Sequence, residues 1–210
     1  MPHHPSPEEM RLLQTALACQ QQGDPAGAAQ ALAEALTLNP QNVDALQLSG
    51  ILKAQTGLLE EGIALIRQAI RQAPSHVGAI YNLGMALSAA GRFDEAEEAY
   101  ARAVAFRPTQ PDLLTALANV QRQRSKNAEA LATYRQAYAA ASSHPMTTLN
   151  LGTMLVEMGL NEEALLVLEK AAALSPNNPI ALSTLATVCE NLGRAEEAKS
   201  WRGKLSPLTN

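Results

Sequence analysis

The chain has 210 residues, of which 47% are hydrophobic and 3% aromatic, and its formal net charge is −4 at pH 7. A mildly acidic chain lacks the basic surface used to bind nucleic acid or an anionic membrane, and no stretch reaches the roughly 20 apolar residues of a membrane-spanning helix. We therefore expect no nucleic-acid partner and no membrane insertion. Because the first residues carry no basic and apolar leader, we expect the protein in the cytoplasm.

Alanine and leucine, both strong helix formers, dominate the sequence. With so few aromatic side chains, the spaces between helices must be filled by small and aliphatic residues. These two features predict an all-α protein.

The chain begins with residues 1–8, which we interpret as a short flexible tail ahead of a helical domain at residues 9–210. Ser6, Pro7 and Glu9 have the pattern of an N-cap, a first helical residue and the third residue of a capping box. The first helix is therefore expected to start beside this tail.

The stretch from Val77 to Gln110 is the most regular helical hairpin in the sequence. Its first half places apolar or small residues at spacings of three and four, which is one face of a helix: Ile80, Leu83, Gly84 and Leu87. Gly91 interrupts this helix, and a second face follows before Pro108: Ala96, Tyr100 and Ala103. Each face is too narrow to form a core alone, so the hairpin needs similar neighbours.

The same pattern recurs every 34 residues. The turn position is occupied by Gly23, Gly57, Gly91, Ser125, Gly159 and Gly193. Prolines close the repeats at the same period or twice that period: Pro40, Pro74, Pro108 and Pro176. The frame gives six repeats, at residues 9–42, 43–76, 77–110, 111–144, 145–178 and 179–210. A helical repeat of this length is typical of a stacked solenoid.

The six repeats resemble the tetratricopeptide repeat (TPR) family over nearly the whole chain. Counted from the first residue of each repeat, the family has a small residue at position 8, here Ala16, Gly50, Gly84, Ala118, Gly152 and Ala186. It has another at position 20, here Ala28, Gly62, Ala96, Ala130, Ala164 and Ala198. Small residues allow two helices to cross closely. The resemblance implies a right-handed α-solenoid of six helix-turn-helix repeats.

In this family, positions 2, 5, 9 and 12 of the first helices line a concave groove that holds peptides. The resemblance therefore implies a groove with the apolar anchors Leu13, Leu17, Ile51, Tyr81 and Met85. The remaining candidate groove residues are Gln47, Asn82, Thr115, Asn119, Arg122, Leu149 and Asn150. The three asparagines are either donors and acceptors for a peptide backbone or simply residues that suit a polar helix face.

Some members of the family grip the acidic C-terminus of a chaperone with lysine, arginine and asparagine. Position 2, where that clamp needs lysine, holds Met10, Asp44, Gly78, Asp112, Met146 and Ile180. We therefore expect no binding of acidic chaperone tails.

No arrangement of residues indicates catalysis, since there is no glycine-rich phosphate loop and no catalytic triad pattern. His3 and His4 are adjacent but lack further ligands, so no metal or cofactor is expected. Cys19 and Cys189 occupy the same position in the first and last repeats, too far apart in a linear stack to bridge, and we expect reduced thiols. The chain is predicted not to be an enzyme.

These observations predict a non-catalytic scaffold that binds a peptide or helix of another protein in the groove. One alternative is the substrate-recruiting TPR region of a larger glycosyltransferase or sulfotransferase. The other is a self-assembling scaffold that associates through its C-terminal repeat, where Trp201 is either part of the core or exposed at a contact.

Overall fold

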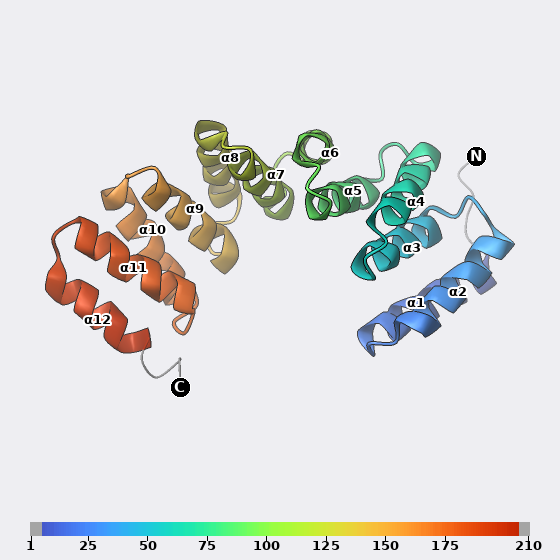
Figure 1. Cartoon of the computed structure of the whole chain (residues 1–210), viewed down its shortest axis with the longest axis horizontal. Helices are drawn as coiled ribbons and strands as arrows, with labels where there is room; N and C mark the ends of the chain where they lie inside the picture. Colours follow the sequence, from blue (N-terminus) through green and yellow to red (C-terminus); the bar gives the residue numbers. More distant parts are fainter. Residues whose placement is uncertain (1–5, 206–210) are drawn as a thin grey trace. The chain divides into compact units, whose positions relative to one another are not determined.

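The structure is a computed structural model that describes residues 6–205. Its described part consists of twelve helices joined by short turns (Figure 1). Their bounds are α1 Pro7–Gln21, α2 Pro25–Leu38, α3 Val43–Gln55, α4 Leu59–Gln72, α5 Val77–Ala89, α6 Phe93–Phe106, α7 Pro111–Gln123, α8 Asn127–Ala140, α9 Pro145–Glu157, α10 Asn161–Leu174, α11 Pro179–Asn191 and α12 Ala195–Leu205. Each odd-numbered helix packs most extensively on the even-numbered helix that follows it. The prediction of an all-α fold with six helix-turn-helix repeats is confirmed.

The first helix begins at Pro7, inside the stretch predicted to be a flexible tail. Ser6 accepts a hydrogen bond from the Glu9 backbone N–H, and the Glu9 carboxylate accepts one from the Ser6 N–H, which completes the capping box. Residues 1–5, including His3 and His4, lie outside the described residues.

The turn within each repeat requires a left-handed backbone conformation. The five glycines at this position have φ between 71° and 88°, and Ser125 takes their place in the fourth repeat with φ of 59°. A residue with a Cβ is strained there, whereas glycine is not. The 34-residue period of the turn glycines therefore has a direct conformational cause.

Close helix crossing explains the small residues at position 8. A Cβ added to Gly84 would lie 2.6 Å from the Tyr100 ring, and one added to Gly152 would lie 2.5 Å from the Leu168 side chain. Both distances are too short for non-bonded carbons. The prediction that these glycines permit close packing of the two helices in each repeat is confirmed.

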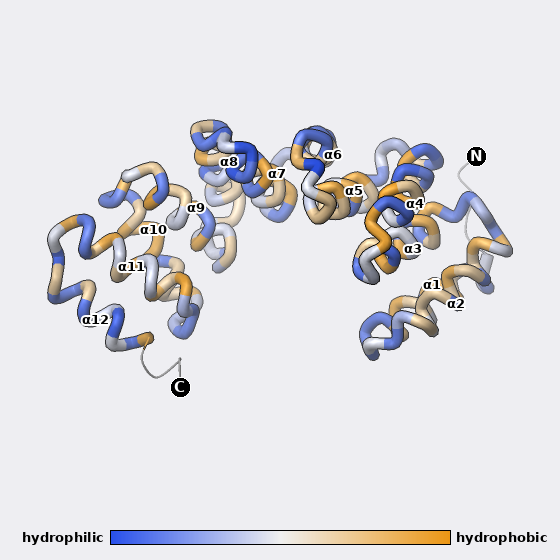
Figure 2. Tube along the Cα trace, in the orientation of Figure 1, coloured by the Kyte–Doolittle hydropathy of each residue, from blue (hydrophilic) through white to orange (hydrophobic). Residues whose placement is uncertain are grey.

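The chain divides into two compact units, each with three repeats. Unit 1 runs to Phe106 and contains α1 to α6, and unit 2 starts at Arg107 and contains α7 to α12. Hydrophobic and hydrophilic residues alternate along the helices of each unit, and α12 is mainly hydrophilic (Figure 2). Trp201 is partly buried against the core of unit 2, as the core interpretation predicted. The remainder of α12 exposes mainly charged side chains.

Ion pairs join the second helices of neighbouring repeats in a fixed register. Arg67 Nη2 of α4 lies 2.6 Å from Glu95 Oε2 of α6, and Arg135 Nη2 of α8 lies 2.7 Å from Glu163 Oε2 of α10. Both pairs join position 25 of one repeat to position 19 of the next. The two units therefore share the same polar contact between second helices.

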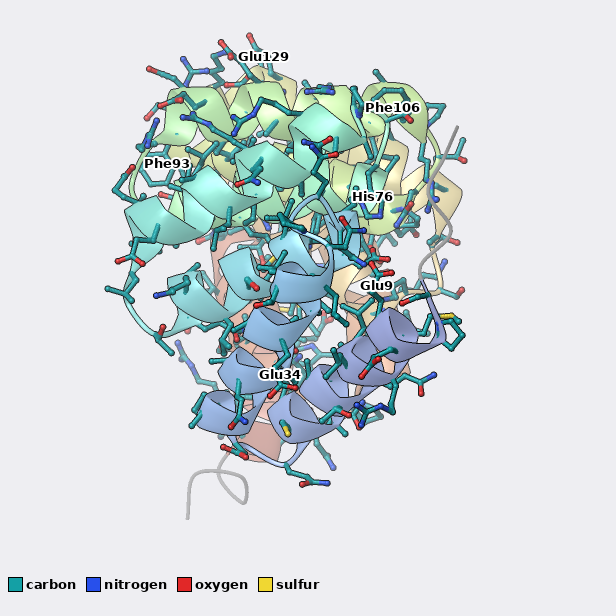
Figure 3. The ribbon with its side chains drawn as sticks, turned by 90° about the vertical axis from the view of Figure 1, so that its right-hand side faces the viewer. Glu9, Glu34, His76, Phe93, Phe106 and Glu129 are labelled. Atoms are coloured by element: carbon teal, nitrogen blue, oxygen red, sulfur yellow. The ribbon has the colours of Figure 1, made fainter. Side chains whose placement is uncertain are left out.

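A buried carboxylate fastens the first repeat to the second. Glu9, near the start of α1 (Figure 3), is 3% exposed. Its Oε1 accepts hydrogen bonds from the side-chain amides of Asn39, at 2.8 Å, and Asn42, at 2.9 Å. These donors hold the pKa of Glu9 at about 2, mainly through the Ser6 N–H and then the two amides. The capping carboxylate thus also holds the connection between α2 and α3.

Candidate partner-binding site

Four apolar residues among those predicted for the groove of unit 1 are half-buried or exposed on its odd-numbered helices. Leu17 on α1 and Met85 on α5 are 43% and 50% exposed, and Ile51 on α3 is half-buried at the same repeat position. Half-buried Tyr81 lies one helical turn before Met85. We call Leu17, Ile51, Tyr81 and Met85 the unit 1 stripe. It is accessible apolar surface that the core does not use.

Two predicted groove residues belong to the core instead. Leu13 is 9% exposed and Leu149 is 4% exposed, and each lies in the hydrophobic core cluster of its unit. Leu13 shares its cluster with residues of its own repeat and with Ala45 and Leu52 of the next. The assignment of Leu13 and Leu149 as accessible groove residues is therefore corrected.

The Tyr81 ring packs against the ring of a buried tyrosine. The Tyr81 and Tyr100 rings are 5.7 Å apart between centroids and tilted by 54°, an arrangement favoured by aromatic quadrupoles. Tyr100 on α6 is buried, and this burial raises its pKa to about 12. The position of Tyr81 is therefore set by the second helix of its own repeat, which the sequence pattern did not reveal.

In unit 2 the corresponding positions are more polar. Asn119 on α7 is exposed, and its side-chain oxygen accepts a hydrogen bond from the hydroxyl of buried Tyr134, whose pKa is raised by burial. Arg122 Nη1 lies 3.6 Å from Glu157 Oε1 of α9. Asn119 and Arg122 therefore already have intramolecular partners, which limits what they can offer a ligand.

Several other predicted residues are half-buried: Gln47, Asn82, Thr115 and Asn150. Gln47 Oε1 and Thr115 Oγ1, both at position 5, are buried and accept no hydrogen bond from the described residues. Asn82 and Asn150 keep part of their surface exposed. An amide or hydroxyl left without a partner in the free protein is a candidate for hydrogen bonding to a ligand.

Polar residues lie close to Gly78 where α5 packs beside α3. Gly78 is exposed and stands at position 2, where the other repeats have larger residues. A Cβ there would lie 3.3 Å from His76 Cε1 and 3.6 Å from Gln47 Oε1. Asp44, one turn before Gln47, lies 3.7 Å from His76 Nε2 through its Oδ1.

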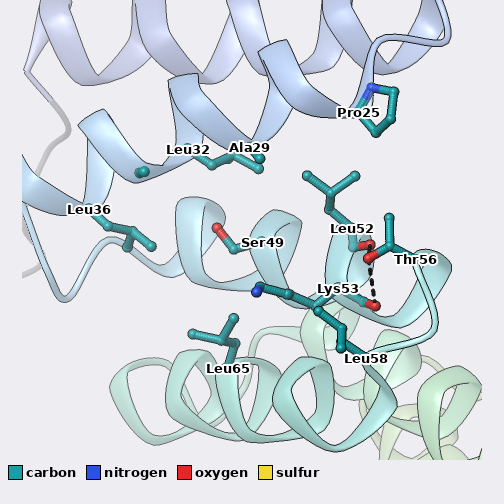
Figure 4. A pocket seen from close by; sticks show the side chains of 11 residues that line it. Pro25, Ala29, Leu32, Leu36, Ser49, Leu52, Lys53, Thr56, Leu58 and Leu65 are labelled. Carbon is teal, nitrogen blue, oxygen red and sulfur yellow. Dashed lines mark hydrogen bonds between the residues drawn. The ribbon is translucent and has the colours of Figure 1, made fainter.

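The opposite face of unit 1 has an apolar groove of about 320 Å³ between α2, α3 and α4 (Figure 4). Leu32, Leu52 and Leu65 are among its lining residues, and Lys53 on its lining is paired with Glu61 at 2.9 Å. This groove was not predicted from the sequence. Its signal was Ala29 at position 21, where three other repeats have isoleucine or leucine: Ile63, Leu131 and Leu165.

Models of the tetratricopeptide repeat match the sequence in overlapping segments. One matches residues 48–111, 81–145 and 115–179, and a second matches residues 20–75. The chain belongs to the tetratricopeptide repeat family. No match to this TPR protein was found among curated proteins.

Solved TPR structures superpose on most of the chain. PilF of Pseudomonas aeruginosa has a TM-score of 0.85 at 19% identity, and covers 96% of this chain and 91% of its own. PilW, described as a type IV pilus biogenesis factor, has a TM-score of 0.84 at 17% identity and covers 98% and 100%. YrrB, described as a TPR protein with an unusual peptide-binding site, has a TM-score of 0.70 at 20% identity and covers 85% and 92%. These likenesses establish the fold.

Three further features of this TPR protein concern membrane spans, cysteines and metal ligands. Within residues 6–205, no helix is both long and apolar enough to cross a membrane. Cys19 and Cys189 are free, and Cys189 is buried, which raises the pKa of its thiol. The same described residues contain no group of three histidine, cysteine or acidic side chains arranged to hold a metal ion.

Proposed function

We propose that this TPR protein is a non-catalytic interaction module whose unit 1 stripe binds an apolar segment of another protein. The observation that carries the proposal is the exposure of Leu17 and Met85 beside half-buried Ile51 and Tyr81. Accessible apolar side chains that gather on one face are a feature of protein interaction surfaces. The peptide-binding site in the description of YrrB supports a peptide or helix as the occupant.

Each side chain of the stripe is expected to contribute only a modest amount to the free energy of binding. Complete burial of a leucine or methionine side chain contributes about 1.5–3 kcal/mol, so covering the exposed halves of Leu17 and Met85 contributes about 1 kcal/mol each. Tyr81 adds an aromatic surface that is already held in place by Tyr100. The site therefore suits a short segment bound through several side chains at once.

The compartment that goes with this proposal is the cytoplasm. Two unpaired cysteines in one chain are compatible with a reducing environment, where thiols persist. The self-assembly alternative has less support, because α12 exposes Glu196, Lys199 and Arg202 rather than an apolar face.

The proposal can be tested without a known partner, by selecting binding peptides from a random library. Dodecapeptides are selected from a random phage-displayed library against the intact chain, resynthesised, and titrated by fluorescence anisotropy. The double variant Leu17→Glu/Met85→Glu places two carboxylates in the stripe and is expected to weaken binding at least tenfold, which corresponds to about 1.4 kcal/mol.

The matched control is Leu38→Glu/Leu166→Glu, which adds the same charge at exposed leucines on the second helices, away from the stripe. Its affinity for the peptides is expected to equal that of the unmodified chain. Circular dichroism checks that both variants remain helical. Equal peptide affinity for the stripe variant and the control would refute the assignment of the stripe.

A further inference from the structure

The apolar groove between α2, α3 and α4 lies within unit 1, on the face opposite the unit 1 stripe. Its volume is about 320 Å³, and Leu36, Leu52 and Leu65 extend into it, one from each of the three helices (Figure 4). Leu58, which also lines it, is 44% exposed. We call this space the α2–α4 groove; its lining includes Ala29, Ala33, Leu36, Leu52, Leu58 and Leu65.

Two short side chains on α2 account for the groove. Ala29 and Ala33 stand at positions 21 and 25 of the first repeat, one helical turn apart, and both are exposed. In the second and fourth repeats the same positions hold a buried apolar residue and an arginine that reaches the next second helix. These pairs are Ile63 with Arg67 on α4 and Leu131 with Arg135 on α8. The α2–α4 groove therefore corresponds to the place that such a pair occupies elsewhere in the chain.

The carboxylate that an arginine would reach is present beside the groove. Glu61 has position 19 of the second repeat, the position of Glu95 and Glu163, which lie 2.6 Å and 2.7 Å from their arginines. The Glu61 side chain is 59% exposed, against 42% for Glu95 and 44% for Glu163. Its Oε2 lies 2.9 Å from the ammonium of Lys53, a lining residue of the groove. Glu61 is thus attached to the groove and less covered than its counterparts.

The ion pair with Lys53 leaves room for a second cation at Glu61. In the next repeat the carboxylate of Glu95 accepts hydrogen bonds from two guanidinium groups, those of Arg67 and Arg92. The charge on the other wall of the groove is also favourable, because α2 contains Glu34 and no lysine or arginine. An incoming basic side chain therefore meets one acceptor and no cation from that helix.

We propose that the α2–α4 groove binds a segment of another protein that presents an apolar side chain and an arginine, the pair that Ala29 and Ala33 do not supply. The apolar side chain packs on Leu52 and Leu65. The aliphatic stem of the arginine lies over Ala33 while its guanidinium bonds to Glu61. Arginine fits better than lysine, since its planar guanidinium can meet a carboxylate through two parallel hydrogen bonds. This site is separate from the unit 1 stripe and does not depend on it.

The chain itself supplies a cover with which to close the groove. Ala29→Leu/Ala33→Arg copies the Leu131 and Arg135 pair of α8 onto α2. Dodecapeptides are selected from the random phage-displayed library against the full chain carrying Leu17→Glu/Met85→Glu, in which the stripe is blocked, and are then resynthesised and titrated by fluorescence anisotropy. Adding Ala29→Leu/Ala33→Arg to that chain is expected to weaken their binding about tenfold or more, because the groove is then filled from within.

The matched control is Ala101→Arg/Ala105→Leu, which adds the same two side chains at exposed alanines of α6, a helix that does not line the groove. Its affinity for the peptides is expected to stay unchanged. Leucine and arginine are strong helix formers, so circular dichroism is expected to show equal helicity for both variants.

The arginine contact is measured separately, without filling the groove. Replacement of the peptide arginine by glutamine is expected to weaken binding about tenfold, the strength of one charge-assisted hydrogen bond. In a chain with Glu61→Gln this loss is expected to fall to about twofold or less. The control is Glu34→Gln, which changes the net charge equally at an exposed residue bonded to Gln30 at 3.1 Å, and here the loss stays about tenfold.

Several results would overturn this inference. One is a selection that returns no peptides, or peptides without arginine. Another is equal peptide affinity for the groove-filling variant and the α6 control. A third is a loss on replacement of the peptide arginine that is the same in Glu61→Gln and Glu34→Gln. None of these results affects the proposed function, whose test uses peptides selected against the unmodified chain, so the two proposals can fail separately.

Discussion

The Glu9 carboxylate should stabilise the first repeat in a way that disappears in acid. Replacement by glutamine keeps one oxygen but turns an amide NH₂ toward groups that are themselves donors: the Ser6 N–H and the amides of Asn39 and Asn42. At least one of these buried donors then loses its acceptor, which costs about 1–3 kcal/mol.

The pKa of Glu9 gives a second measure of the same effect. It is lowered from 4.5 to about 2. At 1.36 kcal/mol for each pKa unit, the ionised form contributes at most about 3–4 kcal/mol, and because the glutamine oxygen still accepts a hydrogen bond we expect Glu9→Gln to cost about 2 kcal/mol at pH 7. Because the folded-state pKa is depressed, this contribution is complete above pH 4.5 and is lost as the pH falls through about 2.

Native-state hydrogen exchange of the α1 and α2 amides measures this local stability better than a global melting curve, since repeat proteins open in parts. The control is Glu8→Gln, the exposed neighbour whose ion pair with Arg11, at 3.6 Å, should contribute little. Equal protection of α1 in Glu9→Gln and Glu8→Gln at pH 7 would contradict the reasoning. So would a difference between them that persists unchanged near pH 2.

Two backbone predictions follow from the glycine positions. Ser125→Gly should raise the free energy of unfolding by about 1 kcal/mol, because it removes the Cβ strain at φ of 59°; a chemical denaturation midpoint that does not rise would contradict this. Gly84→Ala should lower the free energy of unfolding by about 1–2 kcal/mol despite the better helix propensity of alanine, since its Cβ meets the buried Tyr100 ring. A thermally more stable Gly84→Ala protein would show that the Tyr100 ring moves aside at little cost.

Much of the fold could be predicted because its determinants are local and recur. The left-handed turn needs glycine and the crossing needs a small residue, so both appear in the sequence at a fixed period. Ser125 was assigned to the turn series from its position alone, and its positive φ agrees with that assignment. The capping box at Glu9 was likewise visible, since its partners lie three residues apart.

The candidate site was harder to predict because it depends on contacts between repeats. Helical spacing gave the direction of Leu13 and Leu149 but not how far the neighbouring helices cover them. The hydrogen bonds from Asn39 and Asn42 to Glu9 join residues 30 and 33 positions apart, and no local sequence pattern predicts them. The hydrogen bond of Tyr134 to Asn119 was missed for the same reason.

The paired ion contacts between successive second helices have a consequence for how such a chain can change in length. Arg67 with Glu95, and Arg135 with Glu163, are each 28 residues apart, and the repeats that contain these arginines also carry glutamate at position 19, Glu61 and Glu129. A tandem copy of either repeat would therefore place an arginine opposite a glutamate at both of its junctions. These two repeats, unlike those with Ala33, Ala101 or Glu169 at position 25, can be duplicated without losing this contact.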